Sequence, residues 1–171
     1  MFKRTLYLLA ICLSFNASAI TFSDFSSTAG LIMNGATRTV STSDGVVLRL
    51  TPASGGQAGS VFSEATVNAA DFSSFFKFRI TEPDGSIFDC NTEAGADGLV
   101  FVIQPISSDI GGAGQGIGYD GIGSSVGVEF DTWCNAGNND PSSNHIGIIS
   151  QGSVDHGAGS QSKNSYLHIE N

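Results

Sequence analysis

The chain has little positive charge and no long apolar run beyond its first residues, and each shortage excludes a class of protein. Its 171 residues include 7 lysines and arginines against 16 aspartates and glutamates. Such an acidic chain repels phosphate backbones, so nucleic acid is not expected as a partner. No run after residue 19 is long enough to cross a bilayer, so no transmembrane segment is expected there.

The first residues have the pattern of a secretory signal peptide. A basic start at Lys3-Arg4 is followed by an apolar stretch and by the small residues Ala17-Ser18-Ala19. The apolar stretch is too short to span a membrane. We therefore predict a signal peptide over residues 1–19 and one domain over residues 20–171. The predicted location is secreted, periplasmic or at the cell surface.

Cysteine is also scarce. Three cysteines without histidines at suitable spacing do not make a zinc cluster. Cys12 lies in the predicted signal peptide, which leaves Cys90 and Cys134 in a chain bound for an oxidising compartment. A lone pair of cysteines there favours a disulfide over a thiol site. We predict a Cys90–Cys134 disulfide.

Leucine is scarce as well, and no window has a sustained 3.6-residue apolar period, so the sequence does not favour helices. Short runs rich in β-forming residues alternate with turns instead. They cover residues 37–41, 46–51, 72–80, 99–104, 125–132 and 145–150. The alternation in 76–80 predicts a half-exposed strand, and the all-apolar run 99–103 predicts a central strand covered on both faces. This pattern predicts an all-β antiparallel sandwich.

One strand–loop–strand segment collects oxygen and nitrogen donors at regular spacing. These are Glu129, Asp131, Trp133, Asn135, Asp140 and His145. The first three alternate along a predicted strand, so their side chains point to one face. Two acids alone would be explained by a wet strand face, but the whole set favours a cation site. Carboxylate and amide oxygens suit calcium, and carboxylates with one histidine and water suit manganese or a similar ion.

In residue type and in every interval, this set resembles the metal-binding motif of the legume-type, concanavalin A-like lectins. The resemblance covers about residues 21–150 and implies an antiparallel jelly-roll sandwich. It also implies non-catalytic binding of a saccharide or glycoconjugate, with calcium and manganese or another divalent transition metal as cofactors. In the implied roles, Glu129 and His145 hold the transition metal, Asp131 and Asp140 bridge both ions, and Asn135 and the Trp133 carbonyl complete the calcium site.

The segment Ala96-Asp97-Gly98 is similar to the Ala-Asp-Gly segment of the same family. The resemblance implies a cis Ala96–Asp97 peptide and an Asp97 carboxylate that accepts hydrogen bonds from sugar hydroxyls. Gly114 and Gly116 are both candidates for a backbone N–H donor to the sugar, because close approach of the backbone requires glycine. The remaining implied sugar contacts are the Trp133 ring and the Asn135 side chain.

Three other patterns do not support a function. Gly116, Gly118 and Gly121 fit a dinucleotide-binding motif, and residues 123–127 fit a nucleophile elbow. Both motifs require a helix to follow, whereas the next residues are strand-like. The pair Asp155-His156 is interpreted as part of a solvated loop.

A glycoside hydrolase is the enzyme alternative, because jelly-roll endoglucanases share the sandwich architecture. Their retaining chemistry needs two carboxylates about 5 Å apart, the second four or five residues after the first on one strand. Trp133 and Cys134 stand at those positions after Glu129. We therefore expect no enzyme activity. The other alternative is a structural or adhesive surface module without a competent sugar site.

Legume-type lectins continue with several more strands beyond the part that this chain resembles. We therefore expect a domain that is incomplete at its C-terminus. Open strand edges and exposed apolar surface would promote association of chains, which makes a homo-oligomer an expected alternative to the monomer.

Overall fold

The computed structural model describes residues 19–83, 88–90, 92–109, 111–157 and 163–168, so the predicted signal peptide lies almost wholly outside the described residues. Within them the chain is all-β, with two single-turn 3-10 helices, η1 (Gly114–Gly116) and η2 (Ala136–Asn138). The strands are β1 (Leu31–Gly35), β2 (Arg38–Thr42), β3 (Gly45–Arg49), β4 (Gly59–Ser63), β5 (Gly98–Ile103), β6 (Val126–Asp131), β7 (His145–Ser150) and β8 (Lys163–His168). None of the described helices is long and apolar enough to cross a membrane.

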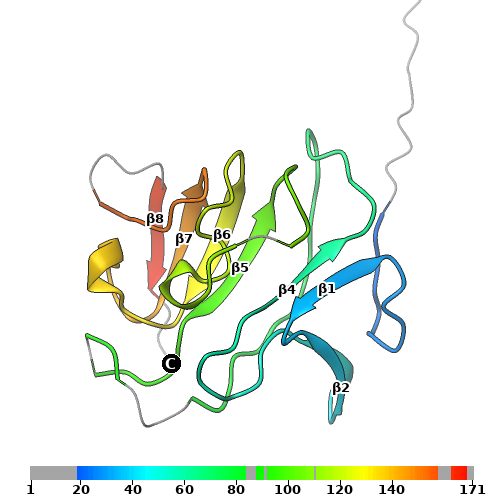
Figure 1. Ribbon diagram of the computed structural model, residues 1–171, viewed down its shortest axis with the longest axis horizontal. Helices are drawn as coiled ribbons and strands as arrows, with labels where there is room; N and C mark the ends of the chain where they lie inside the picture. Colours follow the sequence, from blue (N-terminus) through cyan, green and yellow to red (C-terminus); the bar gives the residue numbers. More distant parts are fainter. Residues whose placement is uncertain (1–18, 84–87, 91, 110, 158–162, 169–171) are drawn as a thin grey trace, which may run out of the picture.

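The strands form three antiparallel sheets (Figure 1). β1 pairs with β4, β2 pairs with β3 as a hairpin, and the largest sheet has the order β5-β6-β7-β8. The hairpin turns tightly at Ser43-Asp44, where the Asp44 N–H donates to the Thr42 hydroxyl oxygen over 3.1 Å. The four-stranded sheet carries the segment that the sequence marked as a cation site.

The predicted run 72–80 forms no strand, which corrects the sequence interpretation. Its alternation is nevertheless real, because Phe76 stacks on Phe101 of β5 at 5.4 Å between ring centroids and Phe78 meets Phe130 of β6 at 4.6 Å. The segment therefore lies over the side chains of the sheet instead of beside one of its edges. Alternation of apolar and polar residues shows which side chains face a neighbouring element. It does not require that the segment be hydrogen-bonded to another strand.

The prediction for run 99–103 is half right. Among the described residues, β5 is an edge strand of the four-stranded sheet and not a central strand. Both of its faces are nevertheless covered: Val100 and Val102 pack against the buried core, and Phe101 meets Phe76 on the other side. A continuous apolar run reports coverage of two faces and says nothing of the number of neighbouring strands.

The core lies against one face of β6 and β7. Tyr119, Ile122, Ile149 and Val154 are its fully or nearly fully buried apolar residues. Gly127 is required there, because a Cβ atom would lie 2.9 Å from Val100 Cγ1 and 3.1 Å from Tyr119 Cε2. The same face of β6 continues with buried Glu129 and Asp131. The acids of β6 thus extend the interior of the molecule, whereas the sequence alone allowed a wet face for them.

Candidate functional site

A buried cluster of acids and histidines lies at the end of β6 and β7. The register pairs Asp131 with His145 and Glu129 with Gly147 across the two strands. Glu129 and His145 are each 1% exposed and Asp131 is 7% exposed. The Glu129 Oε1 atom lies 3.4 Å from His145 Nε2. Strand pairing alone therefore collects three of the predicted ligands.

The loop after β6 adds Asp140 to this cluster. The Asn135 N–H donates to Asp140 Oδ2 over 2.6 Å, and the Trp133 N–H donates to Asp131 Oδ1 over 2.7 Å. The η2 turn (Ala136–Asn138) lies between these contacts. As a result, one ligand atom each from Asp131, Asp140 and His145 lies within 4.8 Å of the other two.

The donor set fits the calcium and transition metal that the motif implies. The Oδ1 atom of Asn135 is buried and accepts no hydrogen bond from the part of the chain that the structure describes. Burial of an amide oxygen without a partner is costly, and a cation bound beside it would remove that cost. Asp131, Asp140 and Asn135 supply the oxygen ligands that calcium takes, and Glu129 and His145 add the mixed set that a transition metal takes.

The interpretation of Asp155-His156 as part of a solvated loop holds for exposed Asp155 and is wrong for His156. His156 is 5% exposed, and its Nε2 lies 2.7 Å from Glu129 Oε1 and 3.8 Å from Asp140 Oδ1. The His156 and His145 rings meet edge to face with centroids 5.1 Å apart. The segment is polar, which suggested solvent. Val154, two residues earlier, is buried in the core, but no pattern in the sequence marks the turn that carries it there.

The charges of this cluster conflict when no cation is present. Burial raises the pKa of Asp131 from 3.8 to about 8, and burial also raises the pKa of Asp140. Burial raises the pKa of Glu129 too, but its hydrogen bonds and attraction to His145 and His156 outweigh this effect and lower the pKa overall. The pKa of His145 is raised, because Glu129 and Asp131 outweigh its burial. Carboxylates that resist ionisation beside one another are what a divalent cation would compensate.

Three loops are joined to one another beside the cluster: the loop that carries Asp97, the loop that follows β6 and the glycine-rich loop. The Ala96–Asp97 peptide is cis, as the resemblance implies. The Asp97 carbonyl accepts the Thr132 N–H over 3.0 Å, which fixes this loop to the end of β6. The half-buried Asp97 carboxyl has a raised pKa because of its burial.

The predicted Cys90–Cys134 disulfide is confirmed, with Cα atoms 5.7 Å apart. Next to it, the Asp89 carboxylate accepts the Cys134 N–H over 2.8 Å through Oδ2 and the Glu93 N–H over 2.9 Å through Oδ1. The loop that leads to Asp97 is therefore joined covalently and by hydrogen bonds to the loop that follows β6.

The glycine-rich loop is the third to reach this surface. Its η1 turn (Gly114–Gly116) is joined to the η2 turn by a 3.2 Å hydrogen bond from Asn138 Nδ2 to the Gln115 carbonyl. Gly116 is buried, and its N–H donates to the Ala113 carbonyl over 3.3 Å. Gly114 is exposed. Of the two candidates, Gly114 is thus the one with a backbone open to a ligand.

The chain is similar in sequence to known proteins. The sequence profile of the legume lectin domain matches residues 16–168. The chain belongs to the legume lectin domain family. Members of this family are non-catalytic carbohydrate-binding proteins, so the family does not favour the hydrolase alternative.

Three relatives illustrate the similarity. A galactose-binding lectin of Arachis hypogaea is 37% identical over 94 residues, which are 52% of this chain and 32% of the relative. An L-type lectin-domain containing receptor kinase of Arabidopsis thaliana is 40% identical over 87 residues, 48% of this chain and 11% of the relative. Lectin DB58 of Vigna unguiculata subsp. cylindrica is 30% identical over 159 residues, 84% of this chain and 56% of the relative. This chain thus spans only part of the length of these relatives.

The structure also removes a possible proton donor from the hydrolase alternative. A second acid would have to stand at position 133 or 134. Trp133 is half-buried, and Cys134 is committed to the disulfide with Cys90. Neither side chain can protonate a leaving group in the way that a carboxylic acid does.

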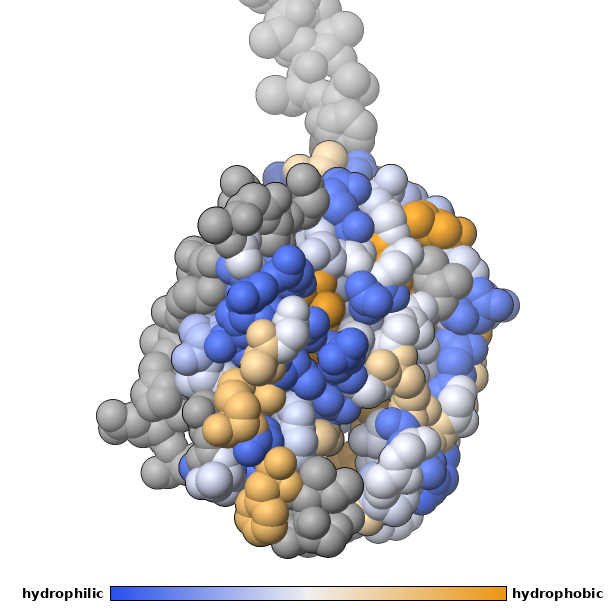
Figure 2. All heavy atoms as spheres, turned by 60° about the vertical axis from the view of Figure 1, so that its left-hand side comes forward, coloured by the Kyte–Doolittle hydropathy of each residue, from blue (hydrophilic) through white to orange (hydrophobic). Residues whose placement is uncertain are grey.

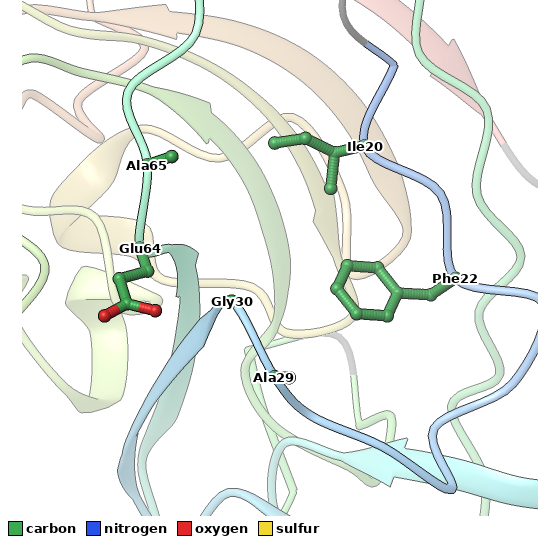
Figure 3. Close-up of a pocket in the computed structure, with 6 residues that line it drawn as sticks. All are labelled: Ile20, Phe22, Ala29, Gly30, Glu64 and Ala65. Atoms are coloured by element: carbon green, nitrogen blue, oxygen red, sulfur yellow. The ribbon is translucent and has the colours of Figure 1, made fainter.

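The candidate site lies apart from an apolar hollow at the N-terminal side of the described chain. Figure 2 views the side on which η2, β7 and β8 lie in Figure 1, and hydrophilic residues predominate across the middle of that face. A separate cavity of about 360 Å³ lies among the N-terminal residues. Ile20, Phe22 and Ala65 point toward one another there, while the Glu64 carboxylate points away (Figure 3). That cavity is apolar and includes none of the predicted site residues.

Proposed function

We propose that this chain binds a saccharide or glycoconjugate, without catalysis, where the Asp97 loop, η1 and η2 meet. Calcium and a divalent transition metal such as manganese would order that surface from below, held by the buried cluster. The observation that carries the proposal is the set of direct contacts that join the three loops to one another and to β6. The family and the named lectin relatives support the same function.

The chemistry of the surface suits sugar hydroxyls, which both donate and accept hydrogen bonds. The Asp97 carboxylate would accept, the Gly114 N–H would donate, and the NH2 of Asn135 would donate while its buried oxygen faces the cation. The half-buried ring of Trp133 offers an apolar surface to a sugar face. Residues 1–19 would direct the chain out of the cell, where calcium is abundant.

The test is a paired titration of saccharide and calcium on the parent chain and on Asp97→Asn. Galactose is the first sugar to use, because one relative is named for binding it. Loss of one charge-assisted bond of about 1.5–3 kcal/mol should weaken sugar binding about tenfold or more. Calcium affinity should stay at the parent value. Asp44→Asn, a change of the same kind on the exposed β2–β3 hairpin, is the matched control.

Other outcomes separate the alternatives. If calcium and sugar affinities fall together in Asp97→Asn, Asp97 is a metal ligand and the division of roles is wrong. If a glycan array shows no binding with or without chelator while the parent chain still takes up calcium, the chain is a structural or adhesive module without a competent sugar site.

A further inference from the structure

His156 is a residue that the lectin motif in the sequence does not contain, and it lies inside the cation cluster. Its Nε2 atom is 2.7 Å from Glu129 Oε1, and His145 Nε2 is 3.4 Å from the same oxygen. One ligand atom from each of these three side chains lies within 4.8 Å of the other two. Two imidazole nitrogens and a carboxylate oxygen therefore face one small, buried volume.

The position of His156 is built into the fold. The backbone N–H of His156 donates to the Asn138 carbonyl of η2 over 2.8 Å. The neighbouring Asp155 carboxylate accepts the Asn139 side-chain amide over 2.8 Å and the Gly157 N–H over 2.7 Å. Two residues earlier, Val154 is buried in the core. The turn is thus held on both sides of His156, which keeps the ring directed at the cluster.

The neighbouring groups also leave space and orient the other ring. A Cβ atom on Gly147 would lie 3.2 Å from both Glu129 Cδ and His156 Cε1, so glycine is what allows these side chains to approach each other. His145 Nδ1 lies 3.0 Å from the Ser142 carbonyl, which can only accept. Nδ1 therefore donates and Nε2 is turned toward Glu129, the orientation that metal-binding histidines usually have.

We propose that His156 is a protein ligand of the transition-metal position, together with Glu129 and His145. This rests on the proposed function, because it assumes that the cluster holds cations, and it adds a second imidazole to the set that the motif supplies. Imidazole nitrogen favours later first-row ions more strongly than oxygen donors do. The position should therefore prefer zinc or cobalt to manganese by a wider margin than a site with one histidine.

The experiment counts the coordinated histidines. The full chain, stripped of metal and held in calcium, is loaded with cobalt(II), and proton NMR is recorded in H2O and in D2O. Each histidine bound through Nε2 contributes one strongly shifted, solvent-exchangeable Nδ1–H resonance. We expect two such resonances in the parent chain and one in His156→Gln. The parent count tests the proposal even if the variant fails to fold.

Affinity gives a second measure. Competition titrations with zinc(II) and manganese(II) should show zinc affinity weakened about tenfold or more in His156→Gln. Substitution of a residue that only hydrogen-bonds to a metal ligand already lowers metal affinity by that much. Manganese binding should change less than zinc binding. Gly137→Ala in η2, where a Cβ atom has open space, is the control for changes in the neighbouring loop.

One exchangeable resonance in the parent chain, or two that persist in His156→Gln, would overturn the proposal, and so would equal loss of both metals. In that case His156 is an ion-pair partner of Glu129 and nothing more. Sugar binding is measured separately. Two resonances without sugar binding would count against the proposed function, and one resonance with intact sugar binding would count against His156 alone.

Discussion

Asp131 is buried, which disfavours its charged form, and it is also a candidate ligand for a cation, which requires that form. It is buried at the end of β6, and burial raises its pKa from 3.8 to about 8 in the metal-free chain. Because this pKa is raised, the native state keeps a proton that the unfolded chain loses as the pH rises above about 4. The contribution of Asp131 to the stability of the metal-free chain should therefore fall between pH 4 and pH 8 and level off above that.

The magnitude follows from the shift. One pKa unit corresponds to about 1.4 kcal/mol, so the change from 3.8 to about 8 corresponds to about 6 kcal/mol across this window. Asp131→Asn is nearly isosteric and stays neutral, so it avoids this loss. In the presence of chelator at pH 8, the variant should melt higher than the parent by on the order of 10 °C or more. Near pH 4 the two should melt together.

The same change should abolish the response to cations. Asp131 lies in the group with Asp140 and His145, and the motif assigns it to both ions. Excess calcium and manganese should raise the melting temperature of the parent. Each ion, at one hundred times its dissociation constant, should add about 2.7 kcal/mol to the free energy of unfolding. The variant should show little of that rise. Differential scanning calorimetry at several pH values, with chelator and with ions, measures both effects.

Two results would refute this reasoning. Equal melting temperatures of chelated parent and variant at pH 8 would mean that Asp131 ionises without cost, so it is not buried as the structure places it. A full response of the variant to both ions would mean that Asp131 is not a ligand. Asp44→Asn on the exposed hairpin removes an exposed ion pair with Arg79, so it should change stability by about 1 kcal/mol or less and leave the response to the ions as in the parent.

Two further predictions test the frame around the site. Reduction of the Cys90–Cys134 disulfide, whose cysteines are 44 residues apart, should destabilise the chain by about 2–4 kcal/mol, and thiol titration of the unfolded, unreduced chain lacking residues 1–19 should find no free thiol. Gly147→Ala should push the Glu129 carboxylate out of place, destabilise the chain by about 1–3 kcal/mol and weaken transition-metal binding, whereas Gly137→Ala should do neither. Two free thiols, or a Gly147→Ala chain with parent metal affinity, would contradict these expectations.

The parts of the site that lie close in sequence were predictable. The strand period of two places Glu129 and Asp131 on one face, and the predicted strand at 145–150 agrees with β7 residue for residue. The disulfide followed from the number of cysteines in a chain that is predicted to be exported. These conclusions depend on patterns among residues that are close in sequence.

The contribution of His156 could not be read from the sequence, because it depends on a turn and not on a period. The chain reverses after β7 through Gln151 and Gly152, both with positive φ, and the Ser153 N–H donates to the Ser150 carbonyl over 3.2 Å. Only this reversal carries Val154 into the core and His156 toward Glu129. A polar segment after a strand gives no sign of such a return.

Strand β4 was missed for the same reason. It pairs with β1, Leu31 opposite Ser63, across many intervening residues, and its run does not show the clear alternation that marks β6 and β7. In the run 72–80 the alternation was read correctly, but the choice between lying over a sheet and joining its edge is made by residues far along the chain. Long-range pairing sets these outcomes, and a single sequence carries little information about it.

The fold gives a physical reason for cations and sugar to depend on each other. The loop from Asn135 to Asp140 contains only one apolar residue, Ala136, so it has almost no hydrophobic burial with which to order itself. Its order in the structure comes from the Asn135 N–H bond to the Asp140 carboxylate, the Asn138 side-chain bond to η1, and the disulfide at Cys134. Cations bound beneath this loop would lower the entropy that a ligand has to remove, and through the same contacts they would fix Asp97 and Gly114. The raised pKa values of Asp131 and Asp140 favour a bound cation, and such a cation would couple the interior of the chain to the surface where we propose that a saccharide binds.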